Sequence, residues 1–289
     1  MRAHALFALF AGATCIALSP IWVRVADVGP TASAFWRVAL AVPLLWAALA
    51  LVPRSTAAAA RPQWPLLAAA GLAFAGDLAF WHWSIQFTSV ANSTLLANLA
   101  SIFVTLAAWL LWRQRPSGQF LVGLALALAG VGLLVRASLG FSETALRGDG
   151  FGVITAMFYA WYLLSVKRLR DLGAATLRLM AVTTTITAAV LLPVALASGD
   201  IMLPAGAQGW LVLLGLAWIT HAGGQGLIAY ALAHLPAAFS SVGLLLQPVL
   251  AALFARALLG EPLGTLQVAG GAVVLTGIYL AGRGSKGTQ

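Results

Sequence analysis

Residues 119–135, QFLVGLALALAGVGLLV, contain a single polar side chain and decide the solvent in which this chain folds. Residues 268–281, VAGGAVVLTGIYLA, are likewise apolar around the whole helix. A soluble amphipathic helix would keep a polar face, and a half-buried strand would alternate at every second residue. About 20 such residues of α-helix cross a hydrocarbon core about 30 Å thick. These stretches therefore predict transmembrane helices.

The rest of the chain repeats this pattern, since 62% of its residues are hydrophobic and 8% are charged. We predict an all-α polytopic membrane protein of ten transmembrane helices, with residues 1–289 as a single transmembrane domain. The first run follows Arg2 as a signal peptide would, but it continues to Val23 without a small-residue cleavage pattern, so we interpret it as a span. The predicted spans are 3–23, 32–52, 64–85, 90–112, 118–136, 149–167, 176–197, 208–232, 237–257 and 264–281.

The net charge of +9 and the pI near 11.1 would suggest nucleic acid in a soluble protein. In a membrane protein, the same excess reports orientation and contact with anionic lipid, so we expect membrane lipid and no nucleic acid as a partner. With the N-terminus inside, 11 Lys and Arg lie on the inner side and 5 on the outer side, which predicts cytoplasmic termini. The outer five are Arg24, Arg37, Arg136, Arg147 and Arg256.

Several function classes lack their motifs. The single Cys15 excludes an internal disulfide and a multi-cysteine metal site. The four histidines do not follow zinc-enzyme spacing, and the sequence contains no nucleophile elbow, P-loop or legible selectivity filter. We therefore expect a transporter rather than an enzyme or a channel, with no cofactor and no metal. The oligomeric state stays open.

The chain resembles itself at an offset of about 146 residues. Pro116 matches Pro262 at 146, whereas Gly123 and Gly130 match Gly270 and Gly277 at 147. Arg37 near the start of the second span likewise mirrors Arg178 near the start of the seventh. Five spans per half is an odd number, so the second half must enter the membrane from the opposite side. We predict two inverted five-helix repeats, residues 1–139 and 146–283, with substrate bound between them near the midplane.

One stretch of the second half resembles the EamA-type transporters of the drug/metabolite transporter superfamily. It reads Gln247-Pro248, then LGEPL at 259–263, followed by Gln267, Gly270 and Gly277. The junction TSVANS at 88–93 is similar to the small-polar hairpin of that family. The first half departs from the pattern, because Ile102 stands in place of Pro248 and Arg115 in place of Glu261.

Within that superfamily, the aromatic pattern is similar to that of the YddG-type bacterial exporters of aromatic amino acids. This resemblance implies an inner-membrane exporter that works by alternating access of a central cavity between two five-helix halves. Its cargo would be a small-molecule substrate, such as a neutral or aromatic amino acid.

Asp77 is the only carboxylate deep within a predicted span, so it should face the bundle interior or water. It either binds a substrate ammonium group or carries a proton, or else it fixes helix packing through a polar neighbour. Trp81 shares its helical face at i+4, whereas His82 lies somewhat off that face. We expect at most one residue of the Trp81–Trp83 run to line a cavity.

Polar groups also fall near the centres of the eighth and ninth spans. His221 and Gln225 share a face at i, i+4, and Gln247 precedes Pro248. Buried polar groups in lipid must find partners, and a substrate and a neighbouring helix are equally plausible ones. Pro248 frees a backbone carbonyl and is, like Pro20, a candidate hinge or gate.

Aromatic side chains of the sixth span could attract an ammonium group or stack with a ring, although core packing is the favoured interpretation. We name Tyr159 and Tyr162 as candidates there. The full set of candidate substrate-binding residues is Trp22, Asp77, Trp81, His82, Asn98, Ser101, Tyr159, Tyr162, His221, Gln225 and Gln247.

Aromatic and amide groups with one acid suit a small amphipathic zwitterion or an organic cation. No basic residue is placed near a span centre by this count, so a phosphorylated cargo is disfavoured. Amino-acid export is the first hypothesis, and efflux of drugs or quaternary amines is the alternative. The two differ in whether the cavity donates to a carboxylate, which His221 and Gln225 would do. Proton coupling stays open.

Overall fold

The computed structural model describes residues 2–52, 63–88, 90–135, 143–260 and 262–285, and every regular element in these ranges is a helix. Nine segments in this part of the chain are long and apolar enough to cross a membrane. The predicted all-α membrane class is thereby confirmed. The nine are Ala3–Val25, Pro30–Leu51, Trp64–Phe87, Ser93–Trp112, Leu146–Asp171, Thr176–Ala197, Ala207–Leu232, Ala237–Leu259 and Thr265–Gly284. The predicted fifth span appears as a shorter apolar helix, Gly118–Leu134.

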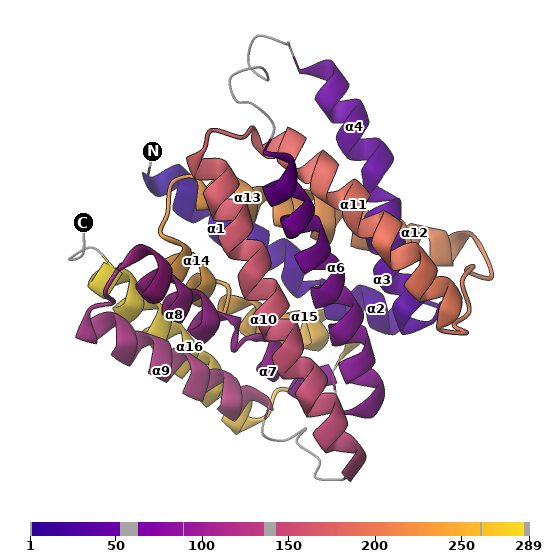
Figure 1. Ribbon diagram of the computed structural model, residues 1–289. Helices are drawn as coiled ribbons and strands as arrows, with labels where there is room; N and C mark the ends of the chain where they lie inside the picture. The colour runs from indigo at the N-terminus through magenta and orange to yellow at the C-terminus, as the bar shows by residue number, and fades with distance from the viewer. Residues whose placement is uncertain (1, 53–62, 89, 136–142, 261, 286–289) are drawn as a thin grey trace.

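The helices form one bundle in which α1 begins and α16 ends at the same end (Figure 1). In the first part of the chain they are α1 (Arg2–Ala17), α2 (Ser19–Val25), α3 (Pro30–Ala39), α4 (Ala41–Leu51), α6 (Trp64–Phe87), α7 (Val90–Ala97), α8 (Ala100–Trp112) and α9 (Gly118–Val135). In the second part they are α10 (Glu143–Asp171), α11 (Thr176–Ala197), α12 (Ala207–Gly215), the π-helix η2 (Leu216–Gln225), α13 (Gly226–Leu232), α14 (Ala237–Gly243), α15 (Leu246–Leu259) and α16 (Thr265–Gly284).

Several spans are broken into two helices, and the two candidate hinge prolines lie just after such breaks. Pro20 occupies the first turn of α2, directly after the break at Leu18. Pro248 is the third residue of α15, after the break at Leu244 and Leu245. A first-turn proline removes an amide that has no helical partner anyway. The expectation that Pro248 frees a carbonyl within a helix is therefore wrong: this proline helps a new helix to begin.

The eighth span changes its helical winding at the place where its glycines cluster. Leu216–Gln225 forms a π-helix between α12 and α13. Gly224 lies against α1, where a methyl group added to it would approach Ile16 Cγ1 to 2.8 Å. Since single π turns inside α-helices are frequent at functional sites, this winding draws attention to Gln225 at its end.

A seam of glycines joins α9 to α16, which lie side by side in Figure 1. A methyl group placed on Gly123 would lie 2.7 Å from the carbonyl oxygen of Gly277. One placed on Gly130 would lie 2.7 Å from the carbonyl oxygen of Gly270. Only glycine permits backbones to approach so closely, as in other small-residue interfaces of membrane helices. This seam connects the first predicted half of the chain to the second.

Two aspartates hold the opposite end of the molecule together. The Asp200 carboxylate accepts hydrogen bonds from the backbone amides of Thr31 (2.7 Å) and Ala32 (3.3 Å), and so caps the N-terminus of α3. The Asp27 carboxylate accepts from the amide of Ala205 at 2.9 Å, just before α12 begins. A carboxylate at a helix N-terminus satisfies free amides and complements the helix dipole. Each predicted half thus supplies a carboxylate to backbone amides at or just before a helix start of the other.

We expect Asp200→Ala to lower the stability of the protein by about 1 kcal/mol, because two amides at the start of α3 lose their cap. In a thermal unfolding assay of the purified protein this corresponds to a fall of about 2–4 °C in Tm. Asp171→Ala is the matched control, since it breaks an exposed i, i+4 ion pair with Lys167 that contributes about 0.3–0.5 kcal/mol. Equal shifts for the two variants would contradict the capping role of Asp200.

Candidate substrate-binding site

A cavity of about 110 Å³ lies at the centre of the bundle, and we call it the central cavity. Side chains from both predicted halves of the chain line it. Eight of the sequence-selected residues are among them: Pro20, Asp77, Trp81, Asn98, Tyr159, Gln225, Gln247 and Pro248. The other lining residues are Ile16, Ala17, Ser19, Arg37, Leu78, Thr94, Ala97, Thr155 and Ala251.

Arg37 lines this cavity, and its side chain is 6% exposed. The sequence predicted Arg37 among the outer basic residues and no basic residue near a span centre, and both predictions are wrong. The guanidinium donates a hydrogen bond from Nη1 to Ser19 Oγ at 3.2 Å, while its Nε has no partner. A buried guanidinium with a free N–H is a ready binding group for a carboxylate. We predicted that His221 and Gln225 would donate to a substrate carboxylate, and Arg37 is a further candidate for that role.

Asp77 brings the opposite charge into the same cavity. It lies on α6 one turn before Trp81, and both side chains reach the cavity wall as their i, i+4 spacing requires. Within the described part of the chain, no hydrogen bond and no close ion pair occupies its carboxylate. The central cavity therefore offers a carboxylate and a guanidinium, each with capacity for a further partner.

Two glutamines complete the polar lining. The amide oxygen of Gln225 and the amide nitrogen of Gln247 are buried, and neither atom has an assigned hydrogen-bond partner among the described residues. Both glutamine side chains lie within hydrogen-bonding reach of the Tyr159 hydroxyl on α10, and Tyr159 also lines the cavity. An unpaired buried amide costs about 1–3 kcal/mol, so these groups need a bound solute or water. Their free atoms are one acceptor and one donor, which is the complement of a zwitterion.

The structure does not bring five other candidates into the cavity. His221 is hydrogen-bonded through Nε2 to Thr184 Oγ1 at 2.9 Å, and the ring packs on Phe74. Tyr162 is 2% exposed, and its ring packs on the same Phe74 ring, with 4.6 Å between the ring centroids. These contacts fix helix packing among α6, α10, α11 and η2.

His82, Ser101 and Trp22 are likewise held by neighbours. The Nδ1 atom of His82 lies 2.7 Å from the Leu78 carbonyl, and Ser101 donates to the Asn98 carbonyl at 3.0 Å. Trp22 packs against Gly215, and its indole N–H is buried without a partner. These three side chains surround the site without lining it.

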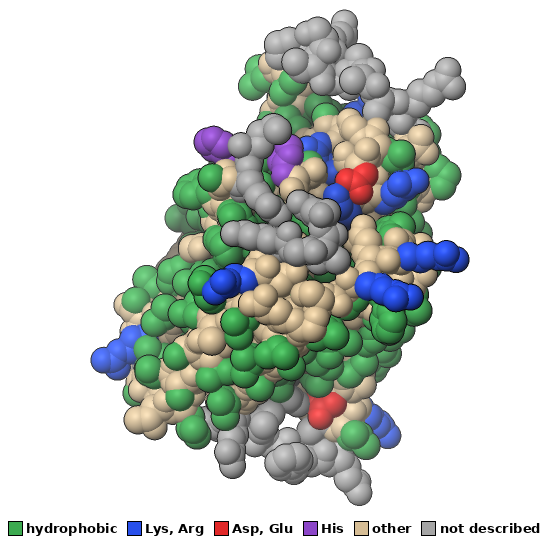
Figure 2. Space-filling model, turned by 90° about the vertical axis from the view of Figure 1, so that its left-hand side faces the viewer, with side chains coloured by type: hydrophobic (Ala, Val, Ile, Leu, Met, Phe, Trp, Pro, Cys, Tyr) green, Lys and Arg blue, Asp and Glu red, His purple; other side chains and the backbone are tan. Residues whose placement is uncertain are grey.

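A second, larger cavity of about 820 Å³ opens at the end of the bundle where α8 ends and α9 begins, and we call it the basic vestibule. Figure 2 shows most of the visible Lys and Arg gathered toward one end of the molecule, beyond a face dominated by hydrophobic side chains. The charged residues that line the basic vestibule are Arg113, Arg115, Lys167, Arg168 and Asp171, and His234 lies beside them.

Buried side chains separate the two cavities. Along α7 and α8, Asn98 lines the central cavity, Ser101 is buried, and Thr105 lines the basic vestibule. Along α10, Leu163 is buried between Tyr159 in one cavity and Lys167 in the other. About one helical turn of packed residues is therefore all that divides the vestibule from the site.

The sequence did not lead us to four polar residues that line the central cavity, namely Arg37, Thr94, Thr155 and Ser19. A signal existed for Arg37, since a charge inside an otherwise apolar run is by default a functional candidate. For the three hydroxyl groups no such signal existed, because Ser and Thr occur throughout membrane helices and bond to their own backbone. Thr155, for example, donates to the Phe151 carbonyl at 2.9 Å.

The bundle of apolar helices around a small, charged, central cavity defines a membrane transport protein. Residues 3–136 and 146–283 each match the EamA-like transporter family, and the chain belongs to this family. Members of this family are transporters, not enzymes.

Similar proteins agree with this assignment. Two proteins of Archaeoglobus fulgidus, both described as uncharacterized transporters, are 28% identical to the chain. One matches over 90% of each chain, and the other over 83% of this chain and 84% of its own. A solved crystal structure superposes with a TM-score of 0.85 at 17% identity over 99% of both chains, which shows a shared fold.

Proposed function

We propose that the protein is a secondary transporter that exports small zwitterions, amino acids foremost, through the central cavity. The observation that carries this proposal is the presence of Arg37 and Asp77 in one small cavity. An α-amino acid has a carboxylate for the guanidinium and an ammonium group for the aspartate. The free atoms of Gln225 and Gln247 supply one further acceptor and one further donor. Trp81 and Tyr159 add aromatic faces for the ammonium group or an apolar side chain.

Cavity size supports a small substrate. Pockets for drug-sized ligands span about 300–1,000 Å³, whereas the central cavity holds about 110 Å³. This volume favours small neutral amino acids over the aromatic ones that the family resemblance implies. It also weighs against efflux of drugs.

Efflux of quaternary amines is the second candidate function, because Asp77, Trp81 and Tyr159 together suit an organic cation. Arg37 weighs against it. A guanidinium in the same cavity repels a ligand that has no carboxylate to neutralise it, and like charges brought together cost several kcal/mol. The presence of Arg37 therefore favours the zwitterion.

We also propose that the chain is built of ten spans in two inverted halves, with α9 as the additional span. A two-fold relation predicts reciprocal contacts, in which equivalent residues exchange partners. Gly123 is equivalent to Gly270 and Gly130 to Gly277, and the glycine seam pairs Gly123 with Gly277 and Gly130 with Gly270. An even number of spans also accounts for α1 beginning and α16 ending at one end of the bundle (Figure 1).

Helix breaks support the same relation. The break between α7 and α8 at Asn98 and Leu99 corresponds, at an offset of 146, to the break between α14 and α15. Both second helices end in a left-handed residue, Arg113 with φ 54° and Gly260 with φ 70°. Paired broken helices at a central site are typical of alternating-access transporters. We place the basic vestibule, and with it both termini, on the cytoplasmic side of a bacterial inner membrane.

Liposomes that contain the purified protein test the proposal through uptake of radiolabelled alanine, leucine, phenylalanine and tryptophan. We expect saturable, protein-dependent flux that is fastest for the smaller amino acids. Tetraethylammonium serves as the matched cation without a carboxylate, and we expect it neither to be transported nor to compete. Transport of tetraethylammonium without any amino-acid flux would replace the zwitterion proposal by amine efflux.

The same vesicles measure coupling when a pH gradient is imposed. Asp77 is the carboxylate in the cavity that could carry a proton together with the substrate. Stimulation of flux by the gradient in the wild-type protein, and its loss in Asp77→Asn, would assign the proton to this side chain. Flux that is independent of the gradient would limit Asp77 to substrate binding.

A further inference from the structure

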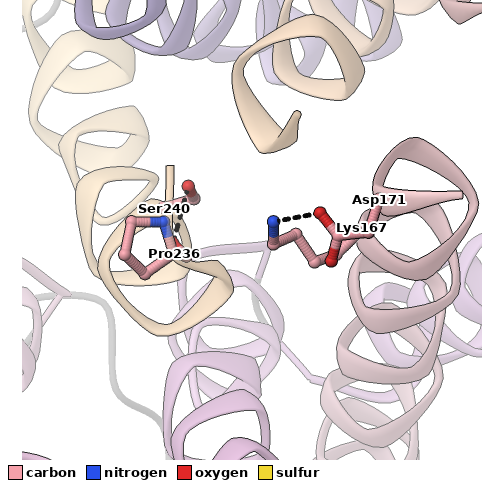
Figure 3. A network of polar contacts seen from close by, with 4 residues as sticks. All are labelled: Lys167, Asp171, Pro236 and Ser240. Atoms are coloured by element: carbon pink, nitrogen blue, oxygen red, sulfur yellow. Dashed lines mark hydrogen bonds and ion pairs between the residues drawn. The ribbon is translucent and has the colours of Figure 1, made fainter. Parts of the chain in front are cut away.

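The basic vestibule concentrates positive charge in one place. Four of the Lys and Arg residues counted on the inner side converge on this one cavity, which holds a single aspartate. That aspartate is already engaged, since Asp171 pairs with Lys167 at 2.5 Å. Figure 3 shows this pair on α10 facing Pro236 and Ser240 across the space between α10 and α14. The vestibule therefore keeps an excess of unneutralised positive charge.

Three arginines provide that excess. Arg113, Arg115 and Arg168 line the vestibule, and none of them forms an ion pair within the described ranges. A guanidinium presents two parallel N–H groups that match the oxygens of a phosphate, and several in one cavity select phosphate over a single carboxylate. The central cavity, by contrast, contains one arginine balanced by one aspartate. The two cavities therefore differ in the chemistry that they recognise.

The backbone conformation at the end of α8 positions Arg113 in the vestibule wall. Arg113 ends α8 in the left-handed region at φ 54°, where the corresponding helix α15 ends in Gly260. A non-glycine residue in this conformation is strained, and such strain concentrates at binding sites. The α9 helix begins at Gly118, a few residues after Arg113, and Ser117 Oγ accepts a hydrogen bond from the Phe120 amide at 3.1 Å. The positive end of the α9 dipole points toward the same space.

The vestibule wall is mixed rather than uniformly polar. Trp112, Phe120, Leu235 and Phe239 line it beside the arginines. Apolar walls beside a cluster of arginines suit an amphipathic phosphodiester, and basic pockets between the ends of transmembrane helices bind anionic headgroups. We propose that the basic vestibule is a binding site for phosphate groups, held by Arg113, Arg115 and Arg168. The phosphate belongs either to an anionic phospholipid or to a soluble phosphate compound, and buried residues separate the vestibule from the central cavity.

Titrations of the purified wild-type protein in detergent test the site and its source. Short-chain phosphatidylglycerol is the anionic lipid, short-chain phosphatidylcholine the matched lipid without net charge, and inorganic phosphate at constant ionic strength the soluble probe. Binding is read from the shift in Tm and from lipid retained in native mass spectrometry. We expect phosphatidylglycerol to bind at least ten-fold more tightly than phosphatidylcholine. An equal shift with inorganic phosphate alone would assign the site to a soluble phosphate.

Two double variants locate the binding. Arg113→Gln/Arg115→Gln should weaken the anionic ligand at least ten-fold, whereas Arg178→Gln/Arg283→Gln removes the same charge outside the vestibule and should leave binding unchanged. An equal loss of affinity in the two double variants would overturn the proposal. The proposal would also fail if the wild-type protein bound the two lipids with equal affinity and inorganic phosphate had no effect. The wild-type titrations decide the question even where a variant yields little folded protein. None of these readouts depends on transport, so the site can fail while the proposed function stands.

Discussion

Replacing Arg37 with glutamine is expected to lower kcat/KM for amino-acid flux into proteoliposomes by roughly 30-fold or more. Truncating one member of a buried charged contact costs about 2–5 kcal/mol, and each 1.4 kcal/mol is a factor of ten. The loss has two parts. The substrate carboxylate loses its guanidinium, and Asp77 is left as an unbalanced charge in the central cavity. Arg37→Lys keeps the charge but loses the planar fork, so we expect a smaller loss of about ten-fold.

Arg178→Gln is the matched control for this variant. Arg178 is the predicted counterpart of Arg37 in the proposed second half, but it is not among the residues that line the central cavity. We expect its flux to stay within about two-fold of the wild-type value, as for surface substitutions generally. The cavity of Arg37→Gln has lost its repulsive guanidinium, so this variant should also gain competition by tetraethylammonium. A folded Arg37→Gln protein with unchanged kcat/KM would remove Arg37 from the substrate site.

The membrane class of the protein could be read from the sequence because hydrocarbon thickness sets the length of a helix directly. The run at 64–85, for instance, appears as the single helix α6. Breaks within spans were harder to predict. The break at Asn98 and Leu99 has no proline or glycine beside it, and it depends on how α7 and α8 pack against other helices. Length and hydropathy do not contain that information.

Arg37 shows why the site was predicted only in part. Its position in the sequence, a few residues inside the predicted span 32–52, suggested a boundary residue. Its depth depends on α3 beginning at Pro30, under the cap that Asp200 supplies from a distant loop. Asp77 was easier to predict as a cavity residue, because a carboxylate in the middle of an apolar run must face a polar environment wherever the other helices lie.

His221 and Gln225 illustrate the same limit on one helix. Their spacing placed both toward the bundle interior, and both are indeed buried. Which of the two faces the cavity depended on partners from other spans. Thr184 on α11 occupies His221, whereas no side chain occupies the amide oxygen of Gln225. Helical periodicity gives the buried face of a helix, and only tertiary contacts decide which polar group on that face stays free for a substrate.

Adding a single methyl group to the glycine seam should test how closely α9 and α16 pack. In Gly123→Ala the new carbon would lie 2.7 Å from the Gly277 carbonyl oxygen, and backbone atoms cannot move aside as a side chain can. We expect a cost of about 1–3 kcal/mol, or a clear fall in Tm, from this overpacking. The thermal stability of the purified protein in detergent measures it.

Gly132→Ala provides the control on the same helix, because no atom lies within 4 Å of the position that its methyl group would take. Alanine is favoured over glycine inside a helix by up to about 1 kcal/mol, so this variant should keep or raise the Tm. The two substitutions are chemically identical, and they differ in whether α16 lies against the glycine. If both variants unfold at the same temperature, α9 and α16 do not pack through these glycines. If only Gly123→Ala is destabilised, close packing of α16 against α9 at this glycine accounts for the difference.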